Sequence, residues 1–242
     1  MDKLPVELIF KVIDYLSIKN MGKFGCVMNI HNLSASGIIT LIGYEKGDIL
    51  CEAIKSGCMN TYKLVLKRGS YGWGESLFIF AAKNGKIEFV KYFLDKGYKI
   101  DEKDNKNYTA LMWVVENGHL DIVKLLINKG ASIHKSDDYF PDNTLMHLAR
   151  DTETIEYLIS IGMSINVFNG RSLSPLSLAC KRNDKEIVEY LLQSGADPNL
   201  VDKEGSKFPP MAIARKMKNP EICVLLLTYG ADPNQLMVEY TL

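Results

Sequence analysis

One spacing recurs five times in this chain and constrains its fold more than any other feature. A small or branched residue is followed by a glycine 16 positions later, and a sixth unit, from Ala149 to Gly162, is three residues shorter. Self-similarity at a fixed period is the signature of a repeat architecture, in which each unit packs against its neighbours. The five pairs are Ala53 and Gly69, Ala81 and Gly97, Val114 and Gly130, Ala179 and Gly195, and Ala214 and Gly230.

Each unit has the pattern of two short helices joined by a tight turn. Thr109, Thr144 and Ser174 stand where a hydroxyl can cap the free amides at the start of a first helix. Gly85 and Gly118 give the backbone the freedom that a tight turn needs. In second helices such as "LDIVKLLINKG", apolar residues cover too wide an arc for a helix with one buried face. We therefore predict that the helix pairs pack against copies of themselves.

The recurring text resembles the ankyrin repeat, with "TALMWVVENGHLDIVKLLINKG" and "SPLSLACKRNDKEIVEYLLQSGADPN" as full copies. The resemblance implies an all-α ankyrin-repeat solenoid of about six helix-turn-helix repeats with hairpin fingers between them. Met112 and Ser177 replace the usual motif histidine, and "HLARDTETIEYLISIG" lacks a full inter-helix turn. The expected repeats are 48–75, 76–103, 104–137, 138–168, 169–201 and 202–235, followed by a tail to residue 242.

The same resemblance implies a binding surface on the concave face and the fingers. Aromatic and apolar residues on successive finger tips would suit the centre of a protein interface, whereas they could also fold back and brace neighbouring fingers. Trp113 follows the buried column of the motif, so we expect it in the core. The expected target-binding residues are Asn105, Lys106, Tyr108, Glu116, Asn117, Tyr139, Phe140, Arg171, Leu173, Lys181, Arg182 and Phe208, with Ser206, Lys216 and Met217 as further variable positions.

Composition and motifs argue against most other functions. The formal net charge is zero, which offers no general attraction to nucleic acid or to an anionic membrane. The five cysteines are scattered without paired spacing, and the four histidines show no ligand spacing, so we expect no metal. No phosphate-binding loop or nucleophile motif is present, so we expect neither an enzyme nor a cofactor.

The first 47 residues follow a different pattern. Apolar residues recur at helical spacing through "LPVELIFKVIDYL", which would suit a helix capping the first repeat. The longer text "LPVELIFKVIDYLSIKNMGKFGCV" resembles an F-box, although the match fades after Val27. That resemblance implies a helical segment, 1–47, that docks on the Skp-type adaptor of a cullin–RING ubiquitin ligase. The contact residues carried over are Leu4, Pro5, Leu8, Ile9 and Val12.

Together the two resemblances predict a non-catalytic adaptor. The ankyrin repeats would hold a target, and the F-box-like segment would bring it to a host ubiquitin ligase. The alternative is a plain ankyrin scaffold or inhibitor, with residues 1–47 serving only as a cap. Abundant lysine and isoleucine indicate an AT-rich genome, such as that of a large DNA virus or an intracellular bacterium. We expect a cytoplasmic protein, in the host cytosol or nucleus if it is viral or a secreted effector.

Overall fold

The computed structural model describes residues 46–57, 59, 62–63, 76–133, 143–200 and 208–234. Within these ranges the chain forms eleven α-helices and no β-strand, with one isolated antiparallel bridge between Lys103 and Thr109. The fold is all-α, as the sequence predicts. The chain divides into two units, Met1–Trp113 and Val114–Leu242.

The first unit is built around aromatic side chains. The helices whose bounds the structure gives in this unit include α3 (Lys46–Lys55), α5 (Leu77–Lys83) and α6 (Ile87–Asp95), and α5 packs against both of the others. Tyr62 is fully buried and meets the rings of Phe89 and Phe93 edge-on, with centroids 5.2 and 5.6 Å apart. Aromatic pairs favour this edge-to-face arrangement. The unit ends within α7 (Ala110–Glu116).

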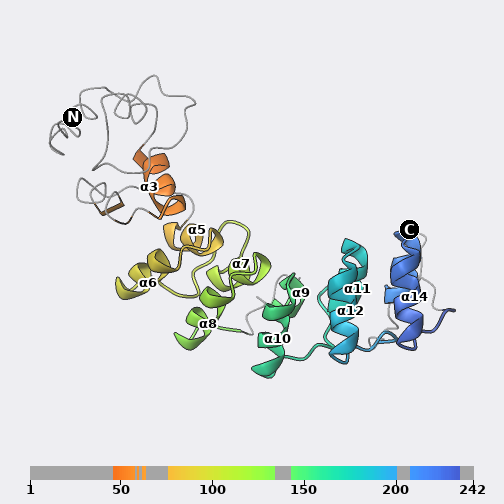
Figure 1. The fold of residues 1–242 in the computed structure, drawn as a ribbon. Coiled ribbons are helices and arrows are strands. Elements are labelled where there is room, and N and C mark those ends of the chain that lie inside the picture. The colour runs from red at the N-terminus through yellow and green to blue at the C-terminus, as the bar shows by residue number, and fades with distance from the viewer. Residues whose placement is uncertain are drawn as a thin grey trace, which may run out of the picture. The chain divides into compact units, whose positions relative to one another are not determined.

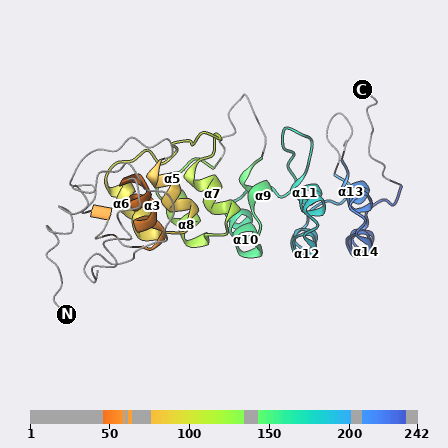
Figure 2. The same cartoon turned by 90° about the horizontal axis from the view of Figure 1, so that it is seen from above.

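The second unit contains helix pairs arranged side by side (Figure 1). Seen from above, α9, α11 and α13 lie in one row, which we call the inner row, and α10, α12 and α14 lie in a second row, which we call the outer row (Figure 2). Helix α11 packs against α9, α12 and α13, and α14 packs against α12 and α13. The bounds are α8 (Leu120–Asn128), α9 (Leu145–Leu148), α10 (Thr152–Ser160), α11 (Pro175–Arg182), α12 (Lys185–Gln193), α13 (Pro210–Lys216) and α14 (Pro220–Thr228).

Local sequence explains where these helices begin and end. The predicted caps are confirmed at Thr109 and Ser174, whose hydroxyl oxygens accept from the amides of Met112 and Ser177. Prolines stand at the start of α11, α13 and α14, where the missing N–H is harmless. The predicted turn glycine Gly118 has a φ of +70°, a conformation that side chains with a Cβ rarely adopt.

The shortened fourth repeat is accommodated in its first helix. Helix α9 has 4 residues, against 8 in α11, and Ala149 already has extended backbone angles. Asp151 then caps α10 by accepting from the amide of Thr154 at 2.7 Å. The deletion therefore removes one turn of the inner helix and leaves the 9-residue outer helix α10 intact.

Two asparagines of the recurring "SIN" and "DPN" text connect consecutive repeats. Asn166 donates from Nδ2 to the carbonyl of Gly195 at 3.3 Å and accepts from the amide of Asp197 at 2.9 Å. Asn199 makes the same pair of bonds to Gly230 and Asp232. Each loop thus takes its position from the loop before it.

None of the helices in the described ranges combines the length and the apolarity needed to cross a lipid bilayer.

Candidate functional site

The finger that carries Tyr108 is organised by one carboxylate. Asp104 accepts from the backbone amides of Lys106 and Tyr108 through Oδ1, at 2.8 and 2.9 Å. Its Oδ2 accepts from the indole Nε1 of Trp113 at 2.7 Å. Asn107 completes the tight turn with a φ of +61°. This turn exposes the predicted target-binding residues Asn105 and Lys106 and leaves Tyr108 half-buried.

Trp113 does not lie in the core as the sequence pattern predicts. Its indole is partly exposed at the base of the finger, with the Tyr108 ring 5.0 Å away between centroids. The ammonium of Lys83 lies 4.0 Å from the ring centroid, and that of Lys106 lies 5.5 Å away. The hydrogen bond to Asp104 explains this position. The indole N–H needs an acceptor where the ring is packed, and its acceptor, the Asp104 carboxylate, lies on the finger rather than in the core. Tyr108 therefore braces its own finger.

The finger between α10 and α11 has the same construction in the second unit. Asn169 accepts through Oδ1 from the amides of Arg171 and Leu173, at 3.0 and 2.9 Å. Ser172 takes the left-handed position, with a φ of +55°. Arg171 is exposed near the tip, whereas Leu173 is only 5% exposed. The expectation of an exposed apolar tip is therefore wrong for Leu173, which packs at the finger base.

Buried polar side chains hold the backbone at the finger bases. His147 is 1% exposed, and its Nε2 lies 2.9 Å from the carbonyl oxygen of Leu173. Because a carbonyl can only accept, Nε2 carries the proton and Nδ1 accepts from Thr144. Ser177, which replaces the motif histidine in the next repeat, donates from Oγ to the carbonyl of Phe208 at 2.9 Å. Burial lowers the pKa of His147 to about 4, and the nearby Arg182 charge adds to the effect.

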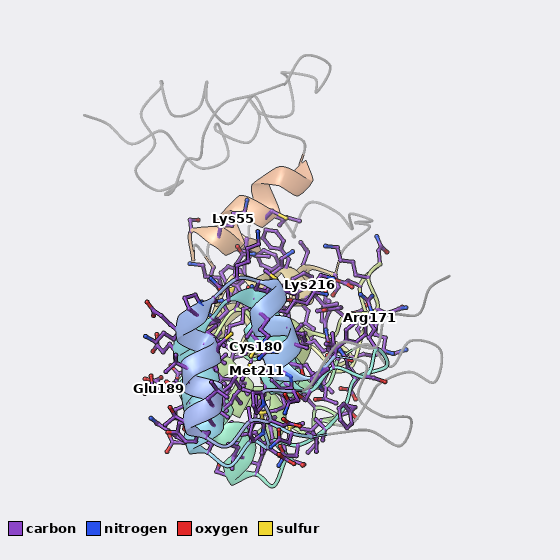
Figure 3. All side chains as sticks on the ribbon, turned by 90° about the vertical axis from the view of Figure 1, so that its right-hand side faces the viewer. Lys55, Arg171, Cys180, Glu189, Met211 and Lys216 are labelled. Carbon is purple, nitrogen blue, oxygen red and sulfur yellow. The ribbon has the colours of Figure 1, made fainter. Side chains whose placement is uncertain are left out.

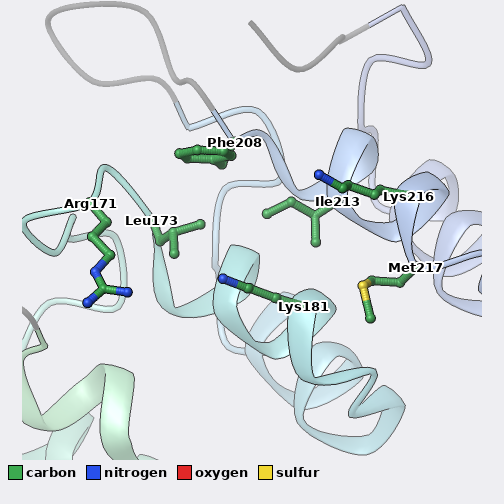
Figure 4. A pocket seen from close by; sticks show the side chains of 7 residues that line it. All are labelled: Arg171, Leu173, Lys181, Phe208, Ile213, Lys216 and Met217. Atoms are coloured by element: carbon green, nitrogen blue, oxygen red, sulfur yellow. The ribbon is translucent and has the colours of Figure 1, made fainter. Parts of the chain in front are cut away.

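A pocket of about 190 Å³ opens beside these two finger bases (Figure 4). Leu173, Phe208 and Ile213 provide its apolar surface, and Met217 lies at its edge with 45% of its surface exposed. The remaining lining residues are cationic: Arg171 from the finger, Lys181 from α11 and Lys216 from α13. Figure 4 shows Leu173, Phe208 and Ile213 lying between Arg171 and Lys216.

The pocket brings together four of the predicted target-binding residues, Arg171, Leu173, Lys181 and Phe208. It also contains two of the further variable positions, Lys216 and Met217. Ile213 was missed, because its place in an apolar helix stretch indicated only core packing. Its side chain is 4% exposed, so it is both a core residue and part of the pocket surface.

Other predicted contact residues have structural partners within the second unit. Glu116 accepts from the guanidinium of Arg150 at 2.6 Å. Arg182 donates to the carbonyl oxygen of His147 at 3.0 Å and so ties α11 to α9. Asn117 lies exposed in the turn after α7. Tyr139 and Phe140 lie outside the described residues, as do the adaptor-binding candidates Leu4, Pro5, Leu8, Ile9 and Val12.

Among the described residues, no group of three or more His, Cys, Asp or Glu side chains could hold a metal ion. Burial raises the pKa of the Cys180 thiol to about 12, so this cysteine is a small core residue rather than a nucleophile.

Paired short helices, glycine turns and projecting fingers define a helical repeat protein. Residues 50–137 and 145–237 match the family model for ankyrin repeats (3 copies), which is well over half of the chain. The chain therefore belongs to the ankyrin-repeat family, whose repeats serve as protein-interaction scaffolds.

Comparisons with individual proteins agree with this assignment. An ankyrin repeat-containing protein of Treponema pallidum (strain Nichols) is 29% identical over 143 residues, which are 58% of this chain and 48% of the relative. An ankyrin repeat protein of fowlpox virus (strain NVSL) is 29% identical over 123 residues, 51% of this chain and 29% of the relative. The chain thus spans less than half the length of these curated relatives.

A solved structure shares the fold. It holds the Bd0816 predatory endopeptidase from Bdellovibrio bacteriovorus in complex with the immunity protein Bd3460. One of its chains aligns at 24% identity with a TM-score of 0.60, covering 74% of the present chain and 97% of that chain.

Proposed function

We propose that this chain is a protein-binding scaffold that holds its target on the finger side of the second unit. The observation that carries the proposal is the pocket beside Leu173 and Phe208, where residues from two fingers and two inner helices meet. Apolar side chains surrounded by cations are typical of the centre and rim of a protein interface. Family membership supports the same role, because ankyrin proteins are generally binding scaffolds rather than catalysts.

Site-specific photo-crosslinking tests this proposal. A benzophenone amino acid would replace Met217 at the pocket or, as the matched control, Val224 on the outer helix α14, which is 63% exposed. Both variants would be expressed in cultured eukaryotic cells and irradiated. We expect defined crosslinked polypeptides from position 217 and none of the same mass from position 224. Identical products from both positions, or none from either, would contradict binding on the finger side.

We further propose that residues 1–47 recruit a Skp-type adaptor, which would make the chain a bridge between its target and a cullin–RING ubiquitin ligase. The support is the order of residues in "LPVELIFKVIDYL", with Leu4, Pro5, Leu8, Ile9 and Val12 as the anchors. A bridge of this kind works by raising the concentration of target near the transferring enzyme. It would act in the cytosol or nucleus of a host cell, and the fowlpox virus relative fits such an origin. The alternative is a plain ankyrin scaffold or inhibitor that sequesters its partner.

A binding assay with purified Skp-type adaptor separates the two forms of the proposal. Wild-type protein would be compared with a Pro5→Ala/Leu8→Asp variant, after circular dichroism has shown equal helix content. We expect micromolar or tighter binding that the variant loses, since truncating an interface anchor typically costs about 2–4 kcal/mol. Absence of binding by the wild type would leave the plain scaffold, in which residues 1–47 only cap the repeats.

A further inference from the structure

The size of the finger-side pocket limits what can occupy it. Its volume is about 190 Å³. An engineered cavity of about 150 Å³ binds benzene, whereas small-molecule sites occupy roughly 300–1,000 Å³. The pocket is therefore large enough for one aromatic or branched side chain and small for a whole metabolite. The nearly buried Leu173 and Ile213 and the Phe208 ring would give such a side chain an apolar environment.

Charge is sorted between the two rows of helices in the second unit. The inner helices α9, α11 and α13 contain no acidic residue, whereas the outer helices contain five glutamates and one lysine. Figure 3 shows Glu189 on the opposite side of the helices from Arg171 and Lys216. The inner-row cations are Lys181, Arg182, Arg215 and Lys216, and the outer-row charges are Glu153, Glu156, Lys185, Glu186, Glu189 and Glu221.

The pocket lysines differ from the lysine of the outer row in their partners. Lys185 pairs with Glu221 at 2.8 Å. Within the part of the chain that the structure describes, neither Lys181 nor Lys216 forms an ion pair. Among the described residues, the pocket therefore combines an apolar surface with two lysines that have no acidic partner, although the whole chain is neutral. Such a surface attracts and orients a partner of opposite charge.

We infer that the pocket binds an acidic segment of a partner protein, in which one apolar side chain fills the pocket and flanking carboxylates pair with Lys181 and Lys216. This inference rests on the proposed scaffold function and specifies the chemistry of its target. A nucleic acid would satisfy the lysines through its phosphates, but the polar atoms of a base would find no hydrogen-bond partner on the apolar surface of Leu173, Phe208 and Ile213. An acidic peptide satisfies both parts of the site.

Selection from a random library tests the inference. Twelve-residue peptides displayed on phage would be selected on the full chain, and the enriched sequences would be synthesised with a fluorescent label. Binding would then be measured to the wild type, to Lys181→Glu/Lys216→Glu, and to the control Lys99→Glu/Lys129→Glu, which makes the same charge change at exposed lysines outside the pocket lining. A Met217→Asp variant and a labelled oligodeoxythymidine probe complete the set. Circular dichroism and urea unfolding would show that each variant is folded.

We expect the enriched peptides to carry several Asp or Glu residues around one Leu, Ile, Phe or Trp. The pocket charge reversal should weaken their binding at least about tenfold and the control pair less than about twofold, since rim charges act mainly through the local field. Replacing the apolar residue by alanine should weaken binding to the wild type but make little difference to Met217→Asp.

Three results would overturn the inference, and they separate it from the function on which it rests. Peptides that need the pocket but lack acidic residues would leave the scaffold function standing and refute the acidic target. Selection of no pocket-dependent peptide would refute both. Oligodeoxythymidine binding that the pocket reversal abolishes and the control spares, at an affinity equal to that of the peptides, would assign the surface to nucleic acid instead.

Discussion

The imidazole of His147 donates from Nε2 to the backbone carbonyl of Leu173, at a distance of 2.9 Å and across 26 residues of chain. A buried side chain of helix α9 thereby positions the finger base of the next repeat. Leu173 is also a pocket residue, so the geometry of the proposed binding site depends on a hydrogen bond made in the core. Ser177 does the same for Phe208, the other finger-base residue of the pocket.

The first prediction concerns pH, because protonating His147 would break this arrangement. Its pKa is about 4 in the folded protein and 6.5 without the fold, so the folded state favours the neutral ring. The contribution of the neutral His147 to the free energy of unfolding is fully present above pH 6.5. It is lost as the pH falls toward 4 and stays lost below that value. The whole shift corresponds to about 3 kcal/mol, of which about 2 kcal/mol falls between pH 7 and pH 5.

Urea unfolding at pH 7 and pH 5, followed by circular dichroism, measures this loss. His147→Gln is the control, because glutamine cannot titrate in this range and the other ionisable groups are unchanged. Between the two pH values, the free energy of unfolding of the wild type should fall by about 2 kcal/mol more than that of the variant. Equal losses in the two proteins would show that His147 does not titrate with folding.

The second prediction tests the asparagine that connects the last two loops. Asn199→Ala removes the bonds to the carbonyl of Gly230 and to the amide of Asp232. Each bond contributes roughly 0.5–1.5 kcal/mol, so unfolding should become easier by about 1–2 kcal/mol. Asn199→Asp keeps the acceptor for Asp232 and should lose about half as much. Amide hydrogen exchange of Asp232 should accelerate in the alanine variant, and unchanged exchange would refute the connecting role.

The third prediction compares two glycines that have the same backbone conformation and different surroundings. Gly118 and Gly130 have φ values of +70° and +88°. A Cβ at Gly118 would lie 3.0 Å from Oδ2 of Asp151, whereas one at Gly130 would meet nothing within 4 Å. Asp151 cannot easily withdraw, because its Oδ1 caps α10.

Gly130→Ala should therefore cost only the left-handed strain, about 1 kcal/mol, and Gly118→Ala should cost about 1–2 kcal/mol more. Denaturant unfolding of the two variants gives the difference directly. In an Asp151→Ala background, Gly118→Ala should cost less than it does in the wild type, because the carboxylate that the new Cβ would meet is absent. Strict additivity of the two substitutions would argue against the contact.

How far the sequence predicts this molecule depends on the range of each interaction. The helix pairs, the caps at Thr109 and Ser174, and the turn at Gly118 follow from local patterns, and the structure confirms them. The burial of Leu173 does not follow, because it depends on how the finger meets the inner helices of neighbouring repeats. The same holds for Ile213, whose helical pattern indicates burial but cannot show that part of its surface borders a pocket.

Trp113 gives the reason for another failure of the pattern. The apolar column of the repeat predicts a core residue at this position, and the polar nitrogen of the indole finds its acceptor in Asp104, nine residues earlier. That pairing is long-range relative to the helix period, so periodicity could not reveal it. In the finger between α10 and α11, Asn169 forms the same backbone turn without a tryptophan.

The fourth prediction uses this natural comparison between the two fingers. Asp104→Asn should keep the turn, because its amide oxygen can accept from Lys106 and Tyr108 as that of Asn169 does from Arg171 and Leu173. The amide nitrogen would then face the indole N–H, and two donors cannot pair. Trp113 should therefore move toward solvent while the finger persists. Asp104→Ala should lose both the turn and the indole bond, at a cost of about 2–3 kcal/mol, because bonds to a charged acceptor are stronger than neutral ones.

Tryptophan fluorescence in a Trp73→Phe background, where Trp113 is the remaining indole, reports the first effect. Its emission should shift to the red in Asp104→Asn at nearly unchanged unfolding free energy. In Asp104→Ala the red shift should come with the loss of stability and faster exchange of the Lys106 and Tyr108 amides. An unshifted emission in Asp104→Asn would mean that the Trp113 indole is held by its packing against Lys83 and Tyr108 rather than by the carboxylate.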